Sequence, residues 1–140
     1  MRLSDDVRTF QNAIRLTANA FHMSEAYAEK DYWGISVLKE IVTRKPDIVF
    51  KGGTSLSKCH HVISRFSEDI DISCSDLYLT QGQRRKNTNS VRESIAAVGL
   101  TINDPEKIHS RRVFNRFVLP YQSVVASSTI DKTVIVELAT

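Results

Sequence analysis

The chain has 140 residues and a formal net charge of +3 at pH 7, which is the size of one domain. With 41% hydrophobic and 25% charged residues, its composition excludes a low-complexity or fibrous protein. No apolar run reaches the roughly 20 residues of a membrane span, and the polar N-terminus lacks the apolar segment of a signal peptide. The two cysteines cannot build a disulfide framework, so we expect a cytoplasmic protein with no membrane partner.

The first half of the chain predicts two helices followed by a short buried strand. Ser4, which precedes two aspartates, is expected to cap a helix over residues 5–21. A second helix is expected from Ser24 to just before Pro46, because the residue preceding a proline disfavours the helical region. The β-rich run 47–51 then predicts the strand. The apolar face of the second helix is expected to comprise Tyr32, Ile35, Leu38, Ile41 and Val42.

The second half of the chain predicts alternating helices and strands. The expected elements are a short helix over 54–62, a strand over 68–73, a helix over 81–98 ending at Gly99, and strands over 114–121 and 133–138. This order predicts an α+β fold in which a mixed β-sheet is flanked by helices. We expect a single domain over 1–140, with N-terminal helices at about 5–43 and a core at about 47–140. Since the chain stops just after an apolar strand, an incomplete or N-terminal portion of a longer protein is also expected.

The positive charge is concentrated between residues 76 and 116. This segment holds eight Lys and Arg residues against four acids, while the rest of the chain holds eleven against twelve. A basic zone of this kind can contact phosphate groups, and a solvated helix face is the alternative. Six of its cations are the predicted surface for an RNA acceptor: Arg84, Arg85, Lys86, Arg111, Arg112 and Arg116.

A phosphate-binding turn is predicted where the strand over 47–51 runs into Gly52 and Gly53. The missing side chains let an anion approach the backbone, and the helix start that follows offers outward amides and hydroxyls. A Walker A loop is excluded, because Cys59 follows the lysine where Ser or Thr is required. An ordinary strand-to-helix turn is the alternative. The candidate phosphate-binding residues are Lys51, Gly52, Gly53, Thr54, Ser55 and Lys58.

An acidic pair follows in the next predicted strand. Asp69 and Asp71 are two residues apart, so their carboxylates should project from one face while Ile70 and Ile72 enter the core. Like charges on one face are costly unless a cation lies between them, and carboxylate oxygens suit Mg²⁺ or Mn²⁺. Glu137, in the last predicted strand, is the candidate third ligand. The alternative is an exposed strand with solvated acids.

These motifs together resemble a known family. The strings Lys51-Gly-Gly-Thr-Ser-Leu-Ser-Lys58 and Arg65-Phe-Ser-Glu-Asp-Ile-Asp71, with Lys30-Asp-Tyr-Trp33 upstream, are similar to the AbiEii/AbiGii-type nucleotidyl transferase toxins. The wider pattern resembles the DNA polymerase β-type nucleotidyltransferase superfamily. The resemblance covers residues 25–75, and it implies a polymerase β-like fold and an abortive-infection or toxin–antitoxin role. The implied enzyme uses Mg²⁺ or Mn²⁺ to transfer nucleotides from an NTP to RNA, tRNA in particular, and has a cognate antitoxin.

The resemblance also implies a role for each candidate residue. The phosphate-binding residues named above would hold the triphosphate, with Lys58 or Lys51 neutralising its charge. Asp69 and Asp71 would bind the metal that orients the α-phosphate. Glu137 would bind a second metal and help to deprotonate the attacking hydroxyl. Ser67, two residues before the acidic pair, is a candidate for self-modification.

Two other functions stay open at this stage. A phosphotransferase on the same fold would use the same turn and metals but deliver the γ-phosphate. A truncated domain could instead bind nucleotide or antitoxin without turnover. Family members are longer and carry a C-terminal helical lobe, for which the residues after Asp71 leave too little room. We therefore expect this chain to lack that lobe.

Overall fold

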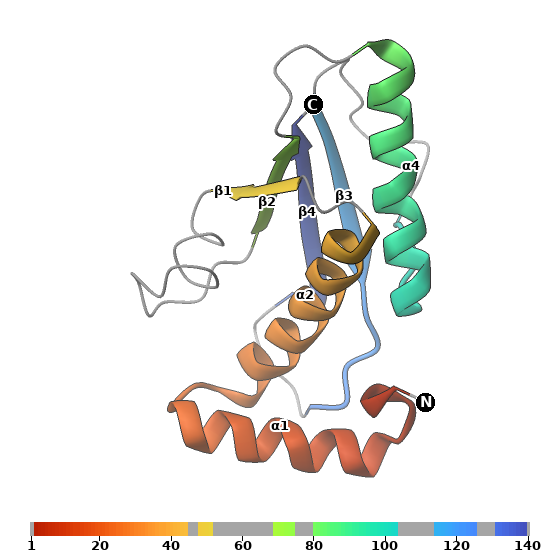
Figure 1. The fold of residues 1–140 in the computed structure, drawn as a ribbon. Coiled ribbons are helices and arrows are strands. Elements are labelled where there is room, and N and C mark those ends of the chain that lie inside the picture. The colour runs from red at the N-terminus through yellow and green to blue at the C-terminus, as the bar shows by residue number, and fades with distance from the viewer. Residues whose placement is uncertain are drawn as a thin grey trace.

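A computed structural model of the protein describes residues 2–44, 48–51, 69–74, 80–103, 114–125 and 131–139. The expected helix over 54–62 lies outside these residues. The elements in chain order are η1 (Leu3–Asp5), α1 (Val7–Phe21), α2 (Glu25–Arg44), β1 (Ile48–Lys51), β2 (Asp69–Cys74), α4 (Gln81–Val98), β3 (Phe114–Pro120) and β4 (Thr133–Ala139) (Figure 1). The predicted α+β class is confirmed.

The capping residues set where the helices begin and end. The N-cap of α1 is Asp6, whose carboxylate accepts a hydrogen bond of 3.2 Å from the Thr9 backbone N–H. The predicted cap at Ser4 is therefore wrong, because Ser4 lies inside the preceding 3₁₀ turn. Helix α4 has the predicted bounds: Thr80 forms a capping box at its start, and Gly99 ends it with a φ of 89°, where a side chain would be strained.

The four strands form one mixed sheet in the order β1-β2-β4-β3. The central strands β2 and β4 are parallel, whereas β1 and β3 pair antiparallel to β2 and β4 respectively. Parallel neighbours require a long crossover connection, and here α4 and β3 lie between β2 and β4 in the chain. This crossover brings two distant acidic segments side by side at the centre of the sheet.

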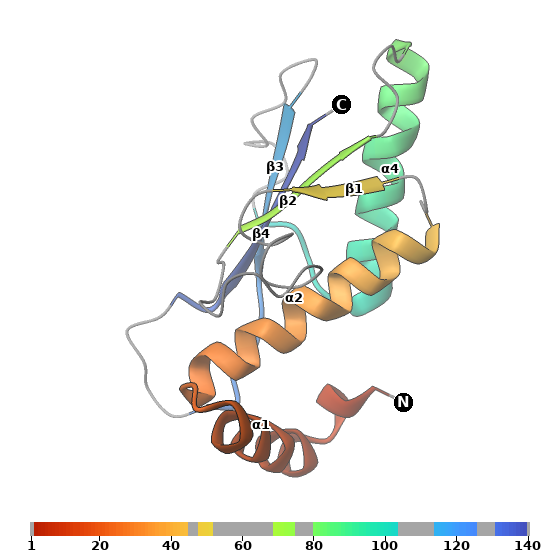
Figure 2. The ribbon, with the colours of Figure 1, turned by 60° about the vertical axis from the view of Figure 1, so that its left-hand side comes forward.

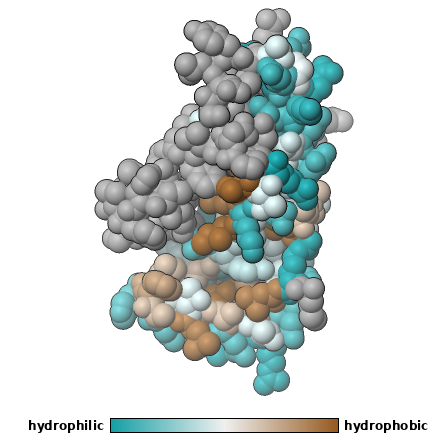
Figure 3. Space-filling model, viewed as in Figure 1, coloured by the Kyte–Doolittle hydropathy of each residue, from teal (hydrophilic) through white to brown (hydrophobic). Residues whose placement is uncertain are grey.

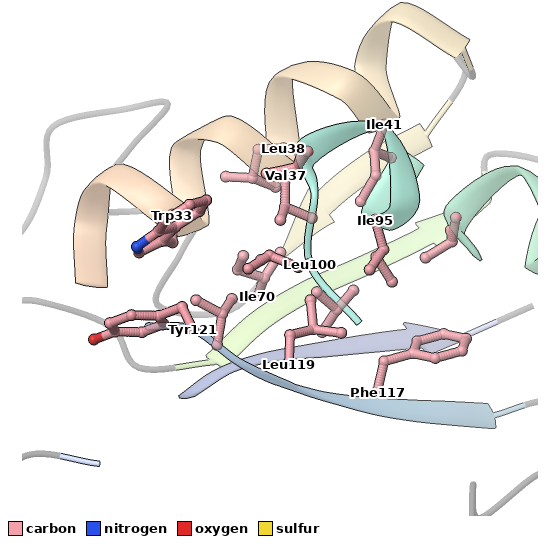
Figure 4. Close-up of a cluster of buried hydrophobic side chains, with 14 of the residues drawn as sticks. Trp33, Val37, Leu38, Ile41, Ile70, Ile95, Leu100, Phe117, Leu119 and Tyr121 are labelled. Carbon is pink, nitrogen blue, oxygen red and sulfur yellow. The ribbon is translucent and has the colours of Figure 1, made fainter. Parts of the chain in front are cut away.

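The core lies between one face of this sheet and the helices α2 and α4, while α1 packs across α2 (Figures 1 and 2). Trp33, Val37, Leu38 and Ile41 of α2 and Ile95 of α4 point at side chains of the sheet, among them Ile70, Phe117 and Leu119 (Figure 4). The apolar face predicted for α2 is correct at Leu38 and Ile41 but wrong at Ile35 and Val42, which are 47% and 40% exposed. The buried stripe is rotated toward Trp33 and Val37, because α4 and the sheet contact the helix on that side.

The surface divides between the helices. Apolar side chains gather over α1 and α2, where Leu16 and Phe21 are each 70% exposed, and hydrophilic side chains cover α4 (Figure 3). Within the described ranges, no helix combines the length and the apolar composition that a membrane crossing requires.

Candidate active site

One row of charged residues crosses all four strands of the sheet. Asp71 of β2 pairs with Glu137 of β4 in the parallel register. On the outer strands, Lys51 of β1 pairs with Asp71, and Arg116 of β3 pairs with Glu137. In the register, the order of residues across the sheet is therefore Lys51, Asp71, Glu137 and Arg116.

The two central acids lie on the face of the sheet opposite to the core. In β2, Ile70 and Ile72 are 4% and 0% exposed, and the half-buried Asp71 between them occupies the other face. In β4, burial alternates in the same way, with Val136 and Leu138 buried on either side of Glu137. A slip of one residue would send every one of these side chains to the opposite face, so burial of the apolar set also fixes where the acids lie.

Glu137 has a basic partner on β3. The Nε atom of Arg116 lies 3.7 Å from Oε1 of Glu137, with side-chain exposures of 45% and 25%. Like charges directly opposite each other on neighbouring strands destabilise a sheet. The arginine offsets the charge that Glu137 places opposite Asp71.

The chemistry of this pair fits a hard divalent cation. Carboxylate oxygens at paired positions on one face are the ligands that Mg²⁺ and Mn²⁺ prefer. The residues that would hold such a cation are Asp71 and Glu137, one from each central strand. Asp69 lies in β2 at the position paired with Ile135, and its side chain is outside the described part. Among the described residues, no cluster of three acidic, His or Cys side chains that could hold a metal ion is assembled.

Of the residues predicted to form the phosphate-binding turn, the structure describes Lys51. Lys51 ends β1 at the position opposite Asp71, so the chain leaves the described strand beside the acidic pair. The other predicted residues of this segment lie outside the described residues: Gly52, Gly53, Thr54, Ser55, Lys58 and Ser67.

The predicted basic surface is divided. Arg84, Arg85 and Lys86 belong to α4, which covers the core face of the sheet, so they lie on the opposite side from the acids. Arg116 alone among the described members is in the row with Glu137. Arg111 and Arg112 fall outside the described residues.

A second polar cluster, which the sequence reasoning missed, lies on the helix side of the sheet. The carboxylate of Glu29 in α2 is fully buried and accepts hydrogen bonds from the Ser123 hydroxyl at 2.6 Å and the Val124 backbone N–H at 2.7 Å. Nζ of Lys132 lies 3.9 Å from the same carboxylate. Burial and the negative charge of Glu29 raise the pKa of the Tyr121 phenol. This cluster holds the segment after β3 against α2, and its long-range partners leave no local signal in the sequence.

Comparisons with known proteins agree with this architecture. The chain has a TM-score of 0.53 and 22% identity to a crystal structure of JHP933 from Helicobacter pylori, over 83% of this chain and 44% of that one. For a second structure, "Crystal structure of putative nucleotidyltransferase from H. pylori", the values are 0.54 and 22%, over 84% of this chain and 46% of that one. These likenesses show a shared fold, and the chain spans less than half the length of either structure.

Sequence comparison gives the family. No curated protein matches the chain. The sequence model of a family described as "Nucleotidyl transferase AbiEii toxin, Type IV TA system" matches residues 36–140, which include all four strands and α4. The chain therefore belongs to the AbiEii nucleotidyl transferase toxin family.

Proposed function

We propose that this chain carries the metal-binding half of a nucleotidyltransferase, in which carboxylates on the face of the sheet opposite to the core bind Mg²⁺ or Mn²⁺ and an NTP. The observation that supports this most directly is the pairing of Asp71 with Glu137 on adjacent parallel strands. Two acidic side chains at paired positions favour a site that a cation completes. Membership of the AbiEii family supports the same reaction class.

Each residue has a distinct role in the proposed reaction. A divalent cation, when bound, would polarise the α-phosphate and stabilise the leaving pyrophosphate. Asp71, together with Asp69, supplies oxygen ligands, and Glu137 supplies a further ligand and accepts the proton of the attacking hydroxyl. The turn predicted at Gly52-Gly53, with Thr54, Ser55 and Lys58, would hold the triphosphate through backbone amides, hydroxyls and one positive charge.

The proposed biological role is that of the toxin of a bacterial toxin–antitoxin or abortive-infection system, encoded with a cognate antitoxin. The family description supports the toxin role. The proposed acceptor is RNA, tRNA in particular, which the basic excess between residues 76 and 116 supports. The chain spans less than half of the length of the solved structures that it matches, so the transfer reaction is proposed for the whole protein.

Metal-dependent nucleotide binding tests the proposal on this chain itself. A fluorescent ATP analogue should bind more tightly with Mg²⁺ than without it, and Asp71→Asn should remove that difference. Asp131→Asn is the matched control, because Asp131 is an exposed aspartate just before β4. Equal affinity with and without metal in the wild type would contradict the proposal.

A label-transfer assay separates the two transfer reactions. The protein is incubated with Mg²⁺, total RNA and ATP labelled at either the α- or the γ-phosphate. Transfer of the α-label with release of pyrophosphate is the expected result. Transfer of the γ-label with release of ADP would identify a phosphotransferase on the same fold.

A further inference from the structure

We propose that Arg116 is the resident counter-ion of Glu137, which a divalent cation must displace, so that this arginine weakens metal binding in the nucleotide-free protein. This inference rests on the proposed function, and it assigns to Arg116 a positioning role at that site. The evidence is the contact with Glu137, the exposure of the arginine and the order of charges across the sheet.

The contact places the guanidinium beside the carboxylate that a metal ion would use. Nε of Arg116 is 3.7 Å from Oε1 of Glu137, and this oxygen belongs to the carboxylate that faces Asp71 across the central strands. A magnesium ion held by the two acids would need oxygens of the same carboxylate at about 2.0 to 2.1 Å. The metal and Arg116 therefore compete for Glu137.

The pair is weak enough to be exchanged. A separation of 3.7 Å is longer than an ordinary charge-assisted hydrogen bond, and the Arg116 side chain is 45% exposed. Exposed ion pairs contribute little to stability because water screens them and side-chain entropy opposes them. Releasing the arginine costs the fold little, in contrast to the release of a buried partner.

The pairing of two acids explains why a cation beside Glu137 is favourable when no metal is bound. The burial of their apolar neighbours holds Asp71 and Glu137 at paired positions, so the two strands cannot shift their register to relieve the repulsion. The register brings Arg116 to the outer side of Glu137. Once a metal has taken over this charge balance, the planar fork of the guanidinium is available for phosphate oxygens on the same face of the sheet.

Manganese binding to the 140-residue chain, followed by the electron paramagnetic resonance signal of free Mn²⁺, tests the competition without any turnover. Arg116→Gln should bind Mn²⁺ about three- to tenfold more tightly than the wild type, because one positive charge beside the divalent cation has been removed. Arg116→Lys keeps the charge and should stay close to the wild type. Arg8→Gln removes an equal charge from an exposed position on α1 and should leave the affinity unchanged.

The outcomes separate the two proposals. Unchanged or weaker Mn²⁺ binding in Arg116→Gln, with binding that still depends on Glu137, would overturn the competition and leave the metal site intact. Binding that Glu137→Gln does not reduce in any variant, or no binding at all, would overturn the metal site and the role of Arg116 with it. Tighter binding in both Arg116→Gln and Arg8→Gln would indicate a general charge effect and would also overturn the inference.

Discussion

Glu29 and Glu137 carry the same carboxyl group on opposite sides of the sheet, and their surroundings differ. Glu29 is fully buried on the helix side, where Ser123 and the Val124 backbone hold both of its oxygens at 2.6 and 2.7 Å. Glu137 is 25% exposed on the open side, where the exposed side chain of Arg116 lies at 3.7 Å. Short hydrogen bonds from buried donors hold the first carboxylate, whereas the exposed side chain of Arg116 lies beside the second.

The surroundings of a glutamate decide whether it stabilises the fold or is suited to bind a ligand. A buried carboxylate is costly unless its oxygens are satisfied, and once they are satisfied it joins the segments that supply the donors. Glu29 thereby joins α2 to the segment between β3 and β4. A partly exposed carboxylate opposite another acid is instead suited to bind a cation, because the cation offsets the repulsion between the two acids.

Removal of Glu29 should have the largest effect. Glu29→Ala leaves the Val124 N–H without its acceptor and the Lys132 ammonium without its ion-pair partner, and we expect a loss of about 3 to 5 kcal/mol in the free energy of unfolding. Urea unfolding measures this loss. Glu40→Ala is the control, because Glu40 forms an exposed pair with Arg44 at 3.6 Å and should change stability by no more than about 0.5 kcal/mol. Similar losses in both variants would contradict a fixed role for Glu29.

The hydroxyl that binds Glu29 should account for part of this loss. Ser123→Ala removes the 2.6 Å hydrogen bond, and since hydrogen bonds to charged groups contribute more than neutral ones, we expect a loss of about 1 to 2 kcal/mol. Ser90→Ala, which removes a hydrogen bond of 3.1 Å on the exposed face of α4, is the matched control. A loss in Ser123→Ala no larger than in this control would show that the backbone N–H alone holds the carboxylate.

Alkaline pH should lower the free energy of unfolding through the ionisation of Tyr121. Its pKa is raised in the folded protein by burial and by the charge of Glu29, so the unfolded chain releases the proton first and stability falls as the pH rises above about 10. Between about pH 9 and about pH 11 the wild type should lose about 1.4 kcal/mol more than Tyr121→Phe. Urea unfolding at the two pH values gives this difference, and equal losses would show that the phenol does not contribute.

Substitution of Glu137, on the face of the sheet opposite to the core, should cause the smallest change in stability. Glu137→Gln removes the negative charge opposite Asp71 together with a partly exposed ion pair, and we expect the free energy of unfolding to change by no more than about 0.5 kcal/mol. In thermal unfolding, Mn²⁺ should raise the midpoint of the wild type and leave that of Glu137→Gln unchanged. A loss above about 1 kcal/mol in this variant would make Glu137 a structural residue like Glu29.

Several features of the fold and the site were predictable because neighbouring residues decide them. The alternation in β2 correctly predicted that Ile70 and Ile72 enter the core, since successive side chains of a strand point to opposite faces. The end of α4 at Gly99 followed from the left-handed conformation that glycine adopts without strain. The metal-ligating roles of Asp69, Asp71 and Glu137 stay a prediction, and the structure adds the pairing of Asp71 with Glu137.

Local patterns in the sequence were enough to predict the α+β class, the positions of most helices and strands, and the acidic motif of the candidate site. Only the tertiary structure decided the strand order β1-β2-β4-β3, the side of α2 that is buried, and the partners of Glu29 and Glu137. Helix ends and strand alternation depend on residues a few positions apart, so they are visible in a local pattern. Glu29 with Ser123 and Glu137 with Arg116 join distant segments, and packing and strand register choose such partners irrespective of local propensity.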